Sequence, residues 1–169
     1  MRVAVTGTPG VGKTTAVERT DTDLPVVHLN DAVREAGLTD GRDEERDTLV
    51  VDEAAVADWL DANAREALVE SHLAHRFPAD RVIVLRCHPE ELSRRLRDRG
   101  ESAATAEENA ESEALDLILA AAVDRHGRDR VYEIDTTDRA PDAVARAIEA
   151  VLAGDREPSA GTVDFTDWL

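Results

Sequence analysis

A single lysine, Lys13, is the residue from which the chemistry of this chain can first be inferred, because the other 19 of its 20 basic residues are arginines. It belongs to residues 7–14, Gly-Thr-Pro-Gly-Val-Gly-Lys-Thr, which fit the phosphate-binding pattern G-x-x-x-x-G-K-[ST]. In such a loop the backbone amides turn toward phosphate oxygens. The compact ammonium group reaches the β- and γ-phosphates, where a planar guanidinium would not fit. The hydroxyl of Thr14 can bind Mg²⁺, so the stretch predicts a site for a magnesium–triphosphate complex.

The residues around this loop are those that an anion site needs. Residues 2–6 (Arg-Val-Ala-Val-Thr) predict a buried strand, and residues 13–19 predict the start of a helix. A glycine loop between a strand and a helix N-terminus directs several amides at one anion. A chance glycine-rich turn is the alternative that this context disfavours.

A second group of candidate residues follows the apolar run 67–70, where Glu70 ends the run. Open α/β sheets bind ligands at this edge, so Glu70 is expected to be a catalytic residue and, with Thr14, a ligand of Mg²⁺. His72 can orient a nucleophilic water or contact phosphate. The alternative is that Glu70 caps a turn and His72 is a solvated loop residue. A GTPase would carry N-K-x-D for guanine; the single lysine is already used, which leaves kinase-like or ATPase-like proteins.

Short apolar runs alternate with helical patterns along the chain. Strands are expected at residues 2–6, 25–29, 67–70, 81–85 and 130–134. Helices are expected at residues 13–19, 31–36, 53–66, 89–98, 106–125 and 141–152. This order predicts a single α/β domain, a five-stranded parallel sheet with helices on both faces.

Two segments differ from this pattern. Residues 39–52 are polar and are expected to form a mobile surface insertion. Residues 153–169 form an acidic tail that holds two of the five aromatic residues, Phe165 and Trp168. These two rings either fold back to cap the domain or anchor a partner-binding peptide, and plain disorder is the third alternative.

The composition combines a formal net charge of −17 with 42% hydrophobic residues. We interpret it as an acidic shell on a folded core, typical of proteins adapted to high salt, because screening weakens repulsion between carboxylates. Melting curves at increasing KCl concentration test this, and higher stability without salt would contradict it.

The net charge also argues against direct nucleic-acid binding. A sole cysteine, Cys87, and the lack of an apolar run near 18 residues predict a cytoplasmic protein with no membrane segment.

Because it has the glycine loop at residues 7–15 and the motif Glu70-Ser71-His72, the chain resembles nucleoside monophosphate kinases. It looks most like the adenylate kinase isoenzyme 6 family, archaeal and nuclear P-loop kinase/ATPase proteins linked to small ribosomal subunit maturation. The resemblance covers about residues 1–152 as a P-loop kinase domain. It implies a monophosphate-binding segment at 28–51 and a short lid at 98–108, with 153–169 as the tail.

The resemblance also implies a role for particular residues. The ATP phosphates would be held by Gly10, Gly12, Lys13, Thr14 and Thr15. The catalytic residues would be Lys13, Glu70, His72 and Arg99. Arg99, which matches the arginine that opens the family's lid, would lie over the transferring phosphoryl group with Arg95 one turn away. Thr136 and Thr137 would lie near adenine.

The resemblance makes Arg34 and Arg95 substrate-binding residues, with Arg34 the candidate for the AMP phosphate. Each arginine has the alternative of a surface charge that balances nearby carboxylates. The chain departs from the family in having glutamate at Glu70, where many members have aspartate. No lid arginine follows Arg99, and Thr105 stands about where many relatives carry lysine.

Two functions follow as expectations. The first is a Mg²⁺-dependent kinase that moves the ATP γ-phosphoryl group to AMP and also has ATPase activity. The second is an assembly factor for the small ribosomal subunit, partnered by a small-subunit ribosomal protein, with nucleotide turnover as a release switch. An acidic surface suits a basic protein better than RNA.

Overall fold

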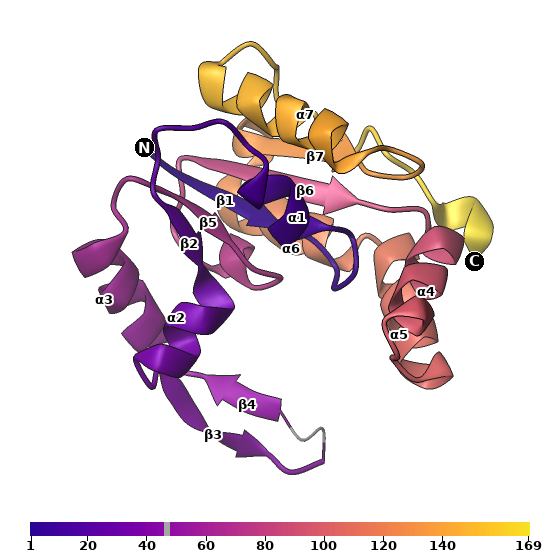
Figure 1. The fold of residues 1–169 in the computed structure, drawn as a ribbon, viewed down its shortest axis with the longest axis horizontal. Helices are drawn as coiled ribbons and strands as arrows, with labels where there is room; N and C mark the ends of the chain where they lie inside the picture. Colours follow the sequence, from indigo (N-terminus) through magenta and orange to yellow (C-terminus); the bar gives the residue numbers. More distant parts are fainter. Residues whose placement is uncertain (46–47) are drawn as a thin grey trace.

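The computed structural model describes residues 1–45 and 48–169. A five-stranded sheet in the order β2-β5-β1-β6-β7 has every neighbouring pair parallel and is covered by helices on both faces (Figure 1). Its strands are β1 (Arg2–Thr6), β2 (Val26–His28), β5 (Ala67–Glu70), β6 (Arg81–Arg86) and β7 (Val131–Asp135). This confirms the predicted α/β fold.

The helices follow the expected order with several changes in their bounds. They are α1 (Lys13–Glu18), α2 (Leu29–Glu35), α3 (Glu53–Asn63), α4 (Pro89–Asp98), α5 (Ala103–Ala114), α6 (Leu117–His126) and α7 (Pro141–Ala153). Short 3₁₀ turns lie at η1 (Ala74–Arg76), η2 (Arg128–Arg130) and η3 (Thr166–Trp168). In the part of the chain that the structure describes, no helix has the length and apolar character needed to cross a membrane.

The two faces of the sheet bury separate apolar clusters, because successive side chains of a strand point to opposite sides. On β1, Val3 and Val5 pack in the cluster that includes residues of α1, α4 and α7. Ala4 packs in the other cluster, with residues of α2, α3 and α6. The central strands are therefore buried on both sides, and their carboxyl ends carry the candidate site.

The prediction of one helix over residues 106–125 was wrong. Helices α5 and α6 are separated at Asp116, which has a left-handed backbone (φ 56°), and its carboxylate pairs with the buried Arg86. The prediction of a helix to residue 66 was also too long, since α3 ends at Asn63. The carbonyl of Ala64 there accepts a hydrogen bond of 2.8 Å from Arg2 Nε.

The polar segment predicted as a surface insertion forms an antiparallel hairpin of β3 (Thr39–Asp43) and β4 (Thr48–Val51). Residues 46–47 of that predicted segment lie outside the described residues. In Figure 1 the hairpin extends away from the main sheet beyond α2 and α3. It therefore adds no strand to the sheet that carries the glycine loop.

The C-terminal tail folds back along the domain. The amide of Ser159 donates to the carbonyl of Val131 at 3.0 Å, and Phe165 is buried. The Phe165 ring meets the His88 ring edge-on, with centroids 5.4 Å apart. The alternative of a capping tail is thus confirmed for Phe165, whereas Trp168 is only partly buried.

Candidate nucleotide-binding site

The glycine loop joins β1 to α1 and has a shape that other residues could not adopt at two points. Gly7 has φ +145°, and a Cβ there would lie 2.5 Å from the carbonyl oxygen of Leu85. Gly10 has φ +96°, and its Cβ would lie within 3.0 Å of Leu92 and Leu96 on α4. The loop is therefore pressed against β6 and α4, and glycine is required at both positions.

Lys13 begins α1, and its side chain folds back over the loop. Nζ donates to the carbonyl oxygens of Gly7 at 2.8 Å and Thr8 at 3.1 Å. Burial lowers the pKa of Lys13 from 10.5 to about 8, while the nearby carboxylates of Glu70 and Glu113 oppose the shift. The ammonium group is thus held in place by its own loop at some electrostatic cost.

Glu70 and Thr14, the two predicted ligands of Mg²⁺, meet at the carboxyl end of β5. Thr14 Oγ1 donates to Glu70 Oε1 at 3.0 Å, and His28 Nδ1 lies 3.0 Å from the same oxygen. His28 was not predicted from the sequence to be a partner of Glu70. It also ends an apolar run, and β2 pairs it directly with Glu70, so the signal that found Glu70 could have found it.

This donor set is sparse. Among residues 1–45 and 48–169, no three His, Cys, Asp or Glu side chains are grouped so that they could hold a metal ion. One hydroxyl and one carboxylate fit Mg²⁺, which keeps several waters and is commonly bound by one or two protein oxygens together with substrate phosphates. The residues present therefore suit a magnesium ion that arrives with a nucleotide.

A cavity of about 280 Å³ lies on one side of the loop. It brings together six of the predicted residues, Gly10, Gly12, Thr15, Arg95, Arg99 and Thr136. It also includes Arg139. Arg139 was not singled out from the sequence, although it follows the last strand at the same sheet edge.

Arg95 lies beside the loop, whereas Thr137 lies outside this cavity. Arg95 donates to the carbonyl of Val11 at 3.3 Å and to that of Thr136 at 3.1 Å, so it lies on the cavity side just described. Thr137 does not line that cavity; its hydroxyl donates to Asp135 at 2.6 Å and accepts from the His88 amide at 2.8 Å. Thr136 occupies the position nearer the loop.

Arg34 lines another cavity, of about 270 Å³, formed mainly by α2 and the segment after β5. Its side chain is 64% exposed and pairs with Asp31. Ser71 also lines this cavity, and its hydroxyl donates to Asn30 Oδ1 at 2.7 Å. The two predicted substrate-binding residues, Arg34 and Arg95, therefore line different cavities.

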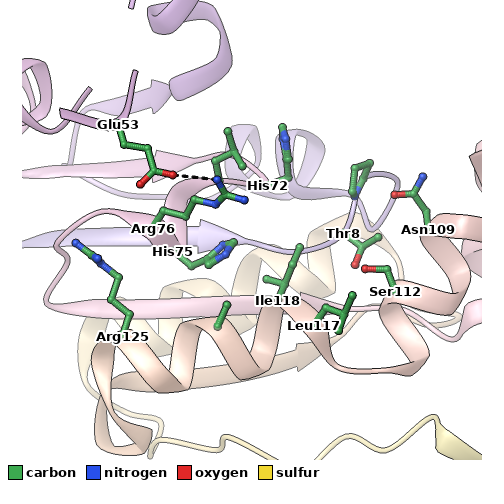
Figure 2. A pocket seen from close by; sticks show the side chains of 13 residues that line it. Thr8, Glu53, His72, His75, Arg76, Asn109, Ser112, Leu117, Ile118 and Arg125 are labelled. Carbon is green, nitrogen blue, oxygen red and sulfur yellow. Dashed lines mark hydrogen bonds and ion pairs between the residues drawn. The ribbon is translucent and has the colours of Figure 1, made fainter. Parts of the chain in front are cut away.

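His72 lines the Arg34 cavity and also a wider cleft of about 620 Å³ that reaches the loop at Thr8 and Pro9. Figure 2 shows His72 above this cleft, with Thr8 toward one end and the ion pair of Arg76 and Glu53 toward the other. Burial and the charges of Lys13 and Arg76 lower the pKa of His72. Its imidazole is therefore neutral at pH 7 and can accept a proton or orient water.

A parallel sheet with a lysine-bearing glycine loop after β1, and an acidic residue at the end of the neighbouring strand β5, defines a P-loop fold. Solved structures share this fold. A shikimate kinase from Bacteroides thetaiotaomicron has a TM-score of 0.56 and 17% identity, covering 90% of this chain and 98% of its own. A sulfotransferase from Alicyclobacillus acidocaldarius has a TM-score of 0.55 and 17% identity, covering 98% and 86%.

Relatives with higher identity define the family. A family model described as an AAA domain matches residues 3–116. Proteins named "Putative adenylate kinase" are 63% identical in Natronomonas pharaonis, over all of both chains, and 64% identical in Halobacterium salinarum, again over all of both. One from Pyrococcus furiosus is 38% identical over 98% of this chain and 92% of its own. This chain belongs to the family that these archaeal proteins form.

Proposed function

We propose that this protein is a Mg²⁺-dependent nucleoside monophosphate kinase that converts ATP and AMP into two ADP. One observation carries the proposal: the loop with Lys13 lines one cavity directly, and His72 connects the cleft at Thr8 and Pro9 of the loop with a second, separate cavity. One holds Arg95 and Arg99, and the other holds Arg34, with His72 lining it. A kinase that transfers a phosphoryl group from one nucleotide to another needs a donor site and an acceptor site at one phosphate-binding loop.

On the ATP side, the amides of the loop around Gly10 and Gly12 and the ammonium of Lys13 would bind the β- and γ-phosphates. Thr14 and Glu70 would hold Mg²⁺, which neutralises charge on the phosphates when it is bound. Arg99 lines this cavity and is exposed, so its guanidinium is free to approach the transferring group. Its fixed positive charge would stabilise the transition state without a covalent intermediate.

On the acceptor side, Arg34 would bind the phosphate of AMP, because a guanidinium can donate two parallel hydrogen bonds to phosphate oxygens. An AMP phosphate oxygen would then attack the γ-phosphorus in line with the departing ADP oxygen. When AMP is absent, His72, which is neutral and lines this cavity, would orient a water molecule for attack on the γ-phosphorus. Slow ATP hydrolysis is the expected side activity.

The decisive experiment measures ADP formation from Mg-ATP by the purified protein in molar-range KCl, with and without AMP. The proposal predicts a large AMP-dependent increase that yields two ADP for each ATP consumed. Slow release of ADP and phosphate at a rate that AMP does not change would overturn it. Nucleoside monophosphates other than AMP, offered in the same assay, would define the acceptor.

A second candidate is favoured by the net charge of −17, which suits a basic protein partner. In this alternative, which rests on the resemblance to the isoenzyme 6 family, the chain binds a small-subunit ribosomal protein and nucleotide turnover releases it. A pull-down from cell extract at native salt tests it. Recovery of no ribosomal component would count against this role and leave the kinase proposal unaffected.

A further inference from the structure

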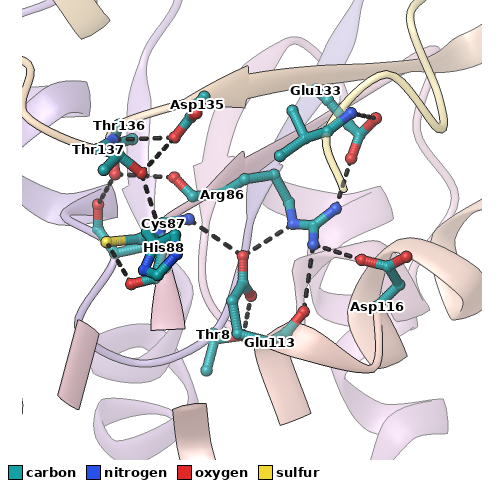
Figure 3. Close-up of polar contacts among 12 residues, drawn as sticks. Thr8, Arg86, Cys87, His88, Glu113, Asp116, Glu133, Asp135, Thr136 and Thr137 are labelled. Carbon is teal, nitrogen blue, oxygen red and sulfur yellow. Dashed lines mark hydrogen bonds and ion pairs between the residues drawn. The ribbon is translucent and has the colours of Figure 1, made fainter. Parts of the chain in front are cut away.

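Glu113 on α5 connects the phosphate-binding loop to β6 (Figure 3). The residue is 3% exposed, and both of its carboxylate oxygens are used. Oε2 accepts a hydrogen bond of 2.6 Å from the hydroxyl of Thr8, and Oε1 accepts bonds of 2.8 Å from Arg86 Nε and 3.1 Å from the Cys87 amide. Thr8 is the second residue of the loop, so a helix far along the chain contacts the loop directly.

Arg86 keeps this carboxylate in its orientation. Its side chain is 1% exposed, and its guanidinium also pairs with Glu133, at 2.5 Å, and with Asp116. The ring of Phe165 in the tail lies 5.4 Å from the guanidinium carbon. A buried charge is stable only when its partners are well placed, so this cluster leaves Glu113 little freedom to turn.

Thr8 passes this constraint on to the loop. Its backbone carbonyl accepts a hydrogen bond of 3.1 Å from Lys13 Nζ and one of 3.3 Å from the Val11 amide. The side chain of Thr8 therefore fixes the peptide group that holds the lysine. Together with the packing of Gly10 on α4, it ties the loop to both helices that flank residues 99–102.

The alternative is that the buried ion pairs only stabilise the fold. For that purpose the contact of Oε1 with Arg86 would be enough, and the second oxygen would not need to meet the loop. We propose that Glu113 is a positioning residue: through Thr8 it holds the loop in the shape in which Lys13 and the glycine amides receive nucleotide phosphates. The inference rests on the proposed binding of ATP by this loop.

The test replaces Thr8 by valine, which keeps the shape of the side chain and removes only the hydroxyl donor. We expect the Kd for Mg-ATP, measured without AMP, to rise about tenfold, the loss typical of a hydrogen bond to a charged group. In the assay with AMP, the KM for ATP should rise in proportion while kcat at saturation stays within about twofold. Thr8→Ser, which restores the hydroxyl, should regain the affinity.

A matched control is Thr162→Val in the tail. The Thr162 hydroxyl donates to the Ser159 carbonyl at 2.9 Å and lies near Glu133, at the far end of the same cluster. If the cluster is only structural, both valine variants should lower the melting temperature and leave the Kd for ATP alone. Wild-type affinity in Thr8→Val would therefore overturn the proposal, whereas a loss confined to Thr8→Val and regained by serine would support it.

Should Thr8→Val fail to fold, Glu113→Asp asks the same question, because its shorter side chain keeps the charge beside Arg86 and withdraws from Thr8. The expected result is again a weaker Kd for ATP, and an unchanged Kd would overturn the proposal. A wild-type protein that binds Mg-ATP but makes no ADP from AMP would defeat the kinase function and leave this test intact. A wild-type protein that binds no Mg-ATP would defeat both.

Discussion

The phosphate-binding loop and the segment proposed to bind the monophosphate are built in opposite ways. Lys13 of the loop is 9% exposed and is held by two carbonyl oxygens of the loop itself. Arg34 of the monophosphate segment is 64% exposed and pairs with Asp31 one turn away on the same helix. One cation is already fixed in place, and the other has the freedom of a surface side chain.

The two regions differ in when the free energy of positioning a cation is spent. In a preformed site the folded protein already holds the buried cation before the ligand binds, and the lowered pKa of Lys13 reflects this unfavourable burial. An exposed side chain loses its freedom only when the ligand arrives, which weakens binding but allows the acceptor to be selected. We therefore expect the loop to govern whether ATP reacts and the Arg34 segment to govern which acceptor receives the phosphoryl group.

Replacing Lys13 by methionine should give the largest effect, a loss on the order of 10³-fold in AMP-dependent ADP formation, because the γ-phosphate loses its fixed charge. The free energy of unfolding should not fall. The pKa of Lys13 is lowered from 10.5 to about 8, which means that the charged ammonium destabilises the folded protein by about 3 kcal/mol, and methionine removes this charge. Steady-state rates and thermal melting check this. Lys13→Arg is the matched control and should be as inactive, whereas retained turnover in either variant would refute the loop assignment.

His72 lies between the two regions, because it lines both the Arg34 cavity and the cleft at the loop. The variant His72→Ala tests whether this residue acts on water or on the acceptor. ATP hydrolysis without AMP should fall about 100-fold, within the range for loss of a positioned acid–base group. Phosphoryl transfer to AMP should fall much less, because the acceptor is held by other groups. Phosphate release and ADP formation are measured on the same preparation, and equal losses would remove any special role of His72 with water.

Arg34→Ala should raise the KM for AMP by about ten- to a hundredfold, the loss of one charge-assisted contact, and leave hydrolysis without AMP unchanged. Arg146→Ala removes an exposed arginine of α7 and serves as the matched control with no expected effect. Initial rates over a range of AMP concentrations give the KM. If it does not change, the phosphate of AMP binds elsewhere and the contrast between the two regions fails.

The two regions also differ in how far the sequence alone could predict them. The loop was predictable because its sequence pattern is local: glycines at 7, 10 and 12 followed by a lysine at 13 are enough to identify it. The alternating runs of the sheet were predictable for the same reason. Glu70 and Thr14 were expected to act on one ion, and the parallel pairing of β1 with β5 brings them into contact.

The rest depends on contacts between distant residues. The break at Asp116 has no glycine or proline to signal it, and it coincides with pairing to Arg86, which lies 30 residues earlier. Glu113 could not be linked to Thr8 for the same reason, since 105 positions separate them. Among so many arginines, composition could not distinguish Arg139 beside the loop from arginines on the surface.

The smallest expected effect is a pH dependence that the two nucleotides do not share. The folded pKa of Lys13, about 8, lies below its usual 10.5, and bound phosphates would raise it again. Between these values the ATP complex holds a proton that the free protein has released, so ATP affinity falls as pH rises. From pH 7 to pH 9 the Kd for ATP should weaken by about tenfold.

Binding of AMP should stay nearly constant over this range, because arginine keeps its charge and phosphate groups, with a pKa of about 6, are already ionised. Calorimetry in two buffers of different ionisation enthalpy measures the proton uptake directly. Uptake with ATP at pH 9 but not with AMP would show that the buried lysine and the exposed arginine serve different nucleotides. Equal uptake with both would mean that Lys13 responds to either phosphate, and the division between a preformed donor site and a ligand-ordered acceptor site would have to be abandoned.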